Sequence, residues 1–128
     1  MANAGAVTVD CNVNLPNKNI PVTVSLESKG VGFVAFRMDL VQGETIIKTI
    51  IENGTEDDLG KEFPLGNALA LSGRVLVTRG SAGAAVAGPI ELQNDFHFND
   101  TVLSSDPAVI DITQTVSSRV FRIRCLFQ

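Results

Sequence analysis

His97 is the only histidine of the chain, and an Asn–Asp pair stands on each side of it in the segment 93–100. Carboxylate and amide oxygens of this kind are ligands that Ca²⁺ prefers. The spacing matches no calcium loop of known geometry, however, and Asn–Asp pairs are common in turns. We therefore predict turns at both pairs. Our first choice for ligand contacts, here and in a second acidic segment, is a set of four aspartates: Asp57, Asp58, Asp95 and Asp100.

Catalysis by His97 would require a nucleophile and an orienting acid from elsewhere in the chain. The Gly-x-Ser-x-Gly and His-Glu-x-x-His motifs are absent, and one histidine excludes a multi-histidine zinc site within a single chain. The acidic cluster from Glu52 to Glu62 is flanked by glycines and is more typical of a solvated loop than of a carboxylate pair in a hydrolase. We predict a protein that is not an enzyme. A pocket around His97 with a hydroxyl and a carboxylate within hydrogen-bond reach would argue against this.

The two cysteines, Cys11 and Cys125, stand near opposite ends of the chain, each on the apolar side of an alternating segment. If those segments are neighbouring strands, a disulfide would close a very long loop and stabilise the fold by about 4–5 kcal/mol. We predict this disulfide, and with it an extracellular, cell-surface or periplasmic location. The alternative is a pair of buried free thiols, which are common in cytosolic cores.

Arginines occupy the polar side of the last segment, where Arg122 and Arg124 alternate with apolar residues. They could bind an anionic ligand or pair with acidic groups on a neighbouring molecule. Charges on a strand at the edge of a sheet also prevent unwanted strand pairing, and this interpretation is equally good.

The elements that must position these residues are strands. Apolar and polar residues alternate strictly from Val7 to Leu15, and a similar alternation runs from Arg119 to Gln128. Gly, Pro, Asn and Asp recur at short intervals between these segments. This pattern predicts an all-β fold of about eight to ten short strands, an antiparallel β-sandwich of the jelly-roll or immunoglobulin-like type. We assign residues 6–128 to this single domain, with its first and last strands adjacent, and residues 1–5 to a flexible tail.

The middle of the chain gives four more predictions. The β-branched run Thr45–Ile51 is typical of a central or interface strand, and Pro64 indicates a short edge strand. Leu69–Val77 has the pattern of one long strand with a bulge at Gly73. The small residues of Gly80–Pro89 indicate a mobile loop.

Composition limits the function. The chain has 128 residues, a net charge of −4 and neither Trp nor Tyr, which disfavours nucleic-acid binding. No apolar run is long enough to span a membrane as a helix. Hydrophobic residues nevertheless make up 45%, an excess that favours an interface.

We predict a structural or adhesive module that self-associates as a homo-oligomer or binds a partner protein. The alternating segment Ala6–Leu15 is also suited to strand addition between molecules. The alternative is a lectin-like sandwich that binds carbohydrate or uses Ca²⁺, the one cofactor considered, although sugars usually stack on Trp and Tyr.

Overall fold

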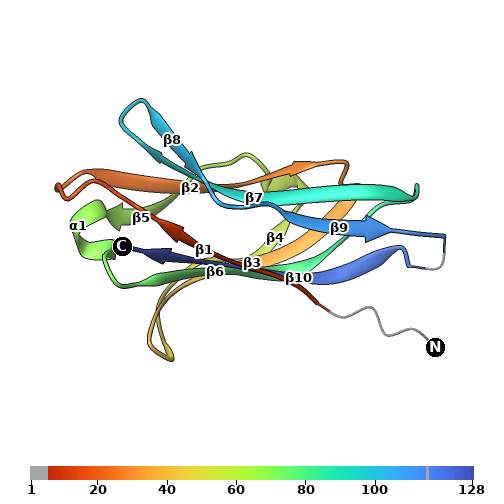
Figure 1. The fold of residues 1–128 in the computed structure, drawn as a ribbon, viewed down its shortest axis with the longest axis horizontal. Coiled ribbons are helices and arrows are strands. Elements are labelled where there is room, and N and C mark those ends of the chain that lie inside the picture. The colour runs from red at the N-terminus through yellow and green to blue at the C-terminus, as the bar shows by residue number, and fades with distance from the viewer. Residues whose placement is uncertain (1–5, 115) are drawn as a thin grey trace.

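Two β-sheets packed face to face make up the protein in this computed structural model, which describes residues 6–114 and 116–128 (Figure 1). The predicted tail, residues 1–5, lies outside the described residues. The first sheet has the strand order β1 (Val7–Val13), β10 (Ser118–Phe127), β6 (Val75–Gly83), β3 (Phe33–Gln42) and β4 (Thr45–Thr55). The second has the order β5 (Phe63–Asn67), β2 (Pro21–Lys29), β7 (Gly88–Phe98) and β8 (Thr101–Ser104), with β9 (Ala108–Ile112) also paired to β7. The prediction of an all-β sandwich is confirmed.

The first and last strands are neighbours, as the sequence predicts. β1 pairs with β10 in register from Val7 opposite Phe121 to Val13 opposite Phe127, which sets Cys11 directly opposite Cys125. The two strands are parallel, whereas the other strand pairs of the described chain are antiparallel. The two cysteines are therefore neighbours on parallel strands, one near each end of the chain.

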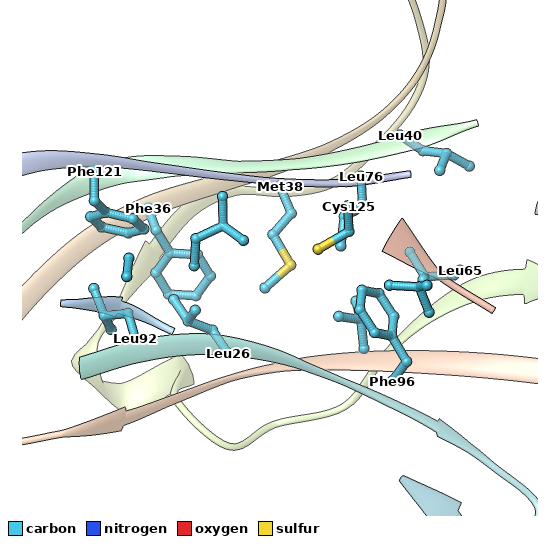
Figure 2. Close-up of a cluster of buried hydrophobic side chains, with 14 of the residues drawn as sticks. Leu26, Phe36, Met38, Leu40, Leu65, Leu76, Leu92, Phe96, Phe121 and Cys125 are labelled. Atoms are coloured by element: carbon cyan, nitrogen blue, oxygen red, sulfur yellow. The ribbon is translucent and has the colours of Figure 1, made fainter. Parts of the chain in front are cut away.

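The core lies between the sheets and follows from the period-two pattern, since alternate side chains of each strand point inward. Phe96 of β7 and Phe127 of β10 pack edge to face across it, with ring centroids 5.3 Å apart. Figure 2 shows Met38, Leu76 and Leu26 in the same layer. Burying each such side chain stabilises the fold by about 1.5–3 kcal/mol relative to leaving it exposed.

The prediction of a mobile loop over Gly80–Pro89 is wrong over most of its length. β6 continues to Gly83 and β7 begins at Gly88, so the connection is residues 84–87. A Cβ atom at Gly80 would clash with the carbonyl oxygen of Ala35 and lie 2.8 Å from the Cα of Phe36. Small residues here permit a close approach of strands rather than mobility.

The segment Leu69–Val77 is not one strand. Ala68–Leu71 forms a single helical turn, α1, whose Ala68 and Leu71 are both buried at a spacing of three residues. Gly73 follows with a φ of +81°, a left-handed conformation that suits a turn, and β6 begins only at Val75. Both the continuous strand and the bulge at Gly73 were therefore wrong predictions, because the four consecutive apolar residues 68–71 fit either period.

The β-branched run Thr45–Ile51 lies in β4, at one edge of the first sheet rather than at its centre. Ile46 and Ile47, which follow the tip of the β3–β4 hairpin, are 49% and 40% exposed. Figure 1 shows this hairpin projecting beyond the body of the sandwich. The edge strand indicated by Pro64 is confirmed, since β5 lies at one end of the second sheet. No helix among the described residues is long and apolar enough to cross a membrane.

Candidate functional site

Arginines line up across the outer face of the first sheet. Arg122 of β10 is directly opposite Arg79 of β6, and Arg79 is directly opposite Arg37 of β3. We call these three residues the arginine row. Like charges directly opposite one another on neighbouring strands destabilise a sheet, so this register is costly unless anions compensate it. The sequence analysis found Arg122 but missed Arg37 and Arg79, because only the strand order brings the three together.

The edge-protection interpretation of Arg122 and Arg124 is wrong, because β10 is not an edge strand. It lies between β1 and β6, so both of its edges are already paired. The two arginines therefore project from the interior of a sheet, and their charges need another explanation.

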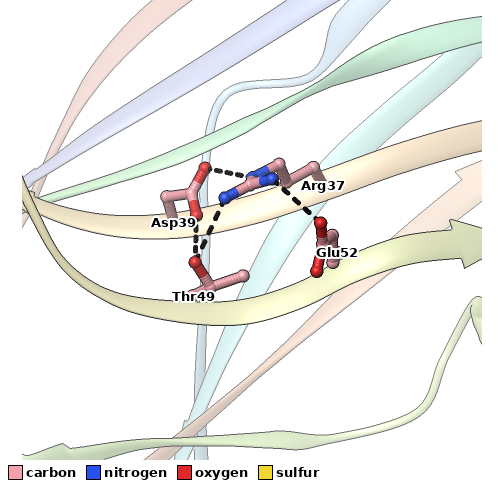
Figure 3. A network of polar contacts seen from close by, with 4 residues as sticks. All are labelled: Arg37, Asp39, Thr49 and Glu52. Atoms are coloured by element: carbon pink, nitrogen blue, oxygen red, sulfur yellow. Dashed lines mark hydrogen bonds and ion pairs between the residues drawn. The ribbon is translucent and has the colours of Figure 1, made fainter.

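Arg37 is neutralised within the protein (Figure 3). Its Nε donates a hydrogen bond of 2.8 Å to Asp39, and one of its Nη atoms lies 3.6 Å from Glu52. Thr49 donates a further hydrogen bond of 2.9 Å to Asp39, which is buried. The hydrogen bond to Asp39 is the main reason that the pKa of Arg37 is raised above its usual value, with smaller contributions from the charges of Asp39 and Glu52.

Arg124, Arg79 and Arg122 differ in whether a carboxylate lies near their charge. Arg124 lies 3.6 Å from Asp10 of β1. Arg79 and Arg122 are exposed, and no carboxylate of the described residues lies within ion-pair distance of either. Two neighbouring guanidinium groups of an otherwise acidic protein are therefore left without a counter-charge.

Two hollows flank the arginine row. One, of about 600 Å³, is lined by Arg37 and Arg79 together with the hydroxyl of Ser81 and the apolar side chain of Val120. The other, of about 390 Å³, is lined by Arg79, Arg122 and Arg124, and Glu44 stands at its side. Arg79 borders both hollows, so the outer face around it is concave and carries positive charge.

The two cysteines form a second candidate site. Their sulfur atoms are 3.1 Å apart as free thiols, within hydrogen-bond distance. The pKa of Cys11 is lowered, chiefly by its hydrogen bond with Cys125. The pKa of Cys125 is raised, first by its hydrogen bond to Cys11 and then by burial. Cys11, which is only half-buried, is therefore the thiol that ionises first.

The four predicted ligand aspartates do not come together. Asp57 and Asp58 lie in a short 3₁₀ turn after β4, where Asp58 accepts a hydrogen bond from the backbone N–H of Thr55. Asp95 lies within β7 and accepts a hydrogen bond from Gln93. Among the described residues no group of three acidic, histidine or cysteine side chains is placed to hold a metal ion. Nothing in that part of the chain favours the calcium-dependent alternative.

The turn prediction is confirmed at one Asn–Asp pair and wrong at the other. Asn99, with a φ of +52°, and Asp100 make the two-residue turn between β7 and β8. Asn94 instead lies inside β7, fully buried, and accepts a hydrogen bond of 2.9 Å from Thr78 of the opposite sheet. A polar residue at an inward position of a strand was the only signal for this link between the sheets.

His97 has a hydroxyl and a carboxylate beside it. Its Nε2 shares a hydrogen bond of 2.9 Å with Ser25, and its Nδ1 lies 4.0 Å from Glu62, beyond hydrogen-bond distance. These are the residue types of a serine hydrolase, but Ser25 is fully buried. A substrate carbonyl cannot approach a covered hydroxyl, so the arrangement supports packing of the outer face rather than acyl transfer.

Comparison with known proteins identifies no relative of this chain. No protein-family model, no curated protein and no solved structure matches the chain. Its function has to be argued from the fold and from these side chains.

Proposed function

We propose that the protein is a non-enzymatic structural or adhesive β-sandwich module that self-associates through the free edge of β1. The observation that carries this proposal is the state of that edge. Among the described residues β1 pairs only with β10; it shows no register shift along its seven residues and contains neither Pro nor Lys. An edge strand without such features is a template for pairing with another chain.

The opposite edge of the same sheet is protected. The pairing of β4 with β3 shifts register at three points, and bulges of this kind twist an edge away from a partner. Lys48 of β4 also reaches the backbone carbonyl of Pro64 in the second sheet, at 3.5 Å. The two edges of the first sheet are therefore not equivalent, and β1 is the one suited to strand addition.

The side chains of β1 support the same interface. Val7, Val9 and Cys11 point toward the core but remain only half-buried, and β1 is the last strand at this end of the sheet among the described residues. A second copy of the chain offers the same edge, so a two-fold axis would pair the two β1 strands antiparallel. With Val9 opposite Val9, Thr8 faces Asp10 and no like charges meet.

The substitution Val9→Lys tests this interface. An inward-pointing lysine on an edge strand can extend into solvent in the monomer but would be trapped between two paired edges. We expect light scattering to show a concentration-dependent dimer for the wild type, and a dissociation constant at least about tenfold higher for Val9→Lys.

Val9→Thr is the matched control, because it keeps a β-branched side chain without charge, and it should dimerise like the wild type. Circular dichroism reports whether each variant keeps its strands. A wild-type protein that stays monomeric at high concentration, or a folded Val9→Lys variant that dimerises normally, would disprove self-association through β1.

The proximity of Cys11 and Cys125 supports an oxidising location for such a module, at the cell surface, outside the cell or in a periplasm, where the pair would be bridged. The predicted partners remain copies of the chain or another protein.

A further inference from the structure

We infer that the outer face of the first sheet binds a tetrahedral oxyanion, the sulfate or phosphate group of a small molecule, between Arg79 and Arg122. This site goes beyond self-association, because it lies on a face of the sheet rather than along the edge of β1. It rests on the register of these strands, on the hollows beside the row, and on the finding that no carboxylate of the described residues forms an ion pair with Arg79 or Arg122.

The register fixes the distance between the two arginines. Residues directly opposite each other on neighbouring antiparallel strands have Cβ atoms about 4.5–5.5 Å apart. Arg79 and Arg122 are such a pair, and both side chains are exposed. Their guanidinium groups can therefore converge on one anion, each with a planar set of donors that matches phosphate-like oxygens.

The surrounding charges leave these two arginines available. Asp39 and Glu52 are engaged by Arg37, and Asp10 lies beside Arg124. A carboxylate ligand has two oxygens in one plane and can accept a full bidentate pair of hydrogen bonds from only one guanidinium group. A sulfate or phosphate group offers at least three oxygens and can accept from both arginines, which is why we assign this chemistry.

Two carboxylates, Asp39 and Glu44, line the hollow of about 390 Å³ together with Arg79 and Arg122. Asp39 is buried and paired with Arg37, so Glu44, which is exposed in the β3–β4 turn, is the carboxylate that opposes binding. Its charge would repel an anion held between the two arginines. Removing that charge should therefore strengthen binding, an effect opposite in sign to that of removing an arginine.

The electrostatic repulsion within the arginine row is itself an argument for a ligand. Arg79 and Arg122 lie directly opposite one another and repel in the free protein, and a sequence keeps such a locally unfavourable arrangement chiefly where function requires it. Replacing Arg79 and Arg122 by glutamine should therefore raise the melting temperature at low salt by about 1–4 °C. This readout also shows that the variant is folded.

Calorimetry at low ionic strength tests the site, with sodium sulfate, sodium phosphate, glucose sulfate and uncharged glucose as probes against sodium chloride of equal ionic strength. We expect the wild type to bind at least one of the charged probes. Arg79→Gln/Arg122→Gln should bind it at least about tenfold more weakly, and Glu44→Gln more tightly.

Lys18→Gln/Lys29→Gln is the matched control, because it removes two exposed positive charges outside the first sheet. It should bind like the wild type. Tighter binding of glucose sulfate than of inorganic sulfate would identify a sugar ester as the source of the group, and equal binding would identify the free ion. The inference is overturned if the wild type binds none of the charged probes, or if the folded arginine variant binds as the wild type does.

Discussion

Oxidation should join Cys11 to Cys125 and raise the free energy of unfolding by about 4–5 kcal/mol. The two residues are direct neighbours on parallel strands, their sulfur atoms are 3.1 Å apart, and they are separated by 114 positions in sequence. A crosslink that closes so long a loop removes much conformational entropy from the unfolded chain. Because the sulfurs already lie 3.1 Å apart on paired strands, the bond requires a movement of only about 1 Å between them.

The chemistry of bond formation follows from the two environments. The Cys11 thiolate attacks oxidised glutathione and releases one glutathione thiolate; Cys125, once deprotonated, then displaces the second and closes the disulfide. The pKa of Cys11 is lowered and that of Cys125 is raised, so Cys11 is the attacking thiol. The rate of the first step should increase with pH and level off below the pH at which an ordinary cysteine would ionise.

Intact-mass spectrometry and urea denaturation test this prediction. Oxidised protein should be lighter by the mass of two hydrogen atoms, and its urea midpoint should exceed that of the reduced protein. Cys11→Ser/Cys125→Ser serves as the control, since its midpoint should not respond to oxidant. Complete alkylation of both native thiols after oxidation, or equal midpoints in the two redox states, would contradict the prediction.

Replacing Phe96 by alanine should cost about 3–5 kcal/mol of stability. Phe96 is fully buried, and its ring meets that of Phe127 at an interplanar angle of 84° across the two sheets. The substitution removes this contact and leaves a cavity that neighbours on two rigid sheets cannot fill. A loss this large approaches the whole stability of a small domain, so partial unfolding at room temperature is an expected result.

Urea denaturation with matched variants tests the role of Phe96. Phe33→Ala is the control, because Phe33 is 43% exposed and its truncation should cost much less. Phe96→Leu retains most of the apolar volume and should remain folded with an intermediate loss. If Phe96→Ala and Phe33→Ala had equal effects, the ring pair would not be a main contact between the sheets.

The strands at the chain ends were predictable because each has one buried face, which imposes strict alternation on the sequence. The same reasoning failed where burial did not follow the alternation of a strand with one buried face. Ala68 and Leu71 are buried on a helical turn, and Gly80 lies inside a strand because two backbones approach closely there. In both segments the residue types suit two conformations, and only packing against the rest of the chain selects one.

The candidate sites divide in the same way. Alternation alone turned Cys11 and Cys125 toward the core and Arg122 toward solvent, since the direction of a side chain is set by its place in its own strand. Which residues then meet depends on strand order and register. The arginine row and the contact of Ser25 with His97 join strands far apart in sequence, and no local pattern encodes such neighbours. The sequence by itself therefore determined the all-β character and the facing of the first and last strands. Only the tertiary structure decided that β10 lies inside a sheet, that β1 is at its edge and that Arg79 lies beside Arg122. The backbone hydrogen bonds between strands do not depend on which side chains the strands carry, so the strand order is decided by the packing of the whole core.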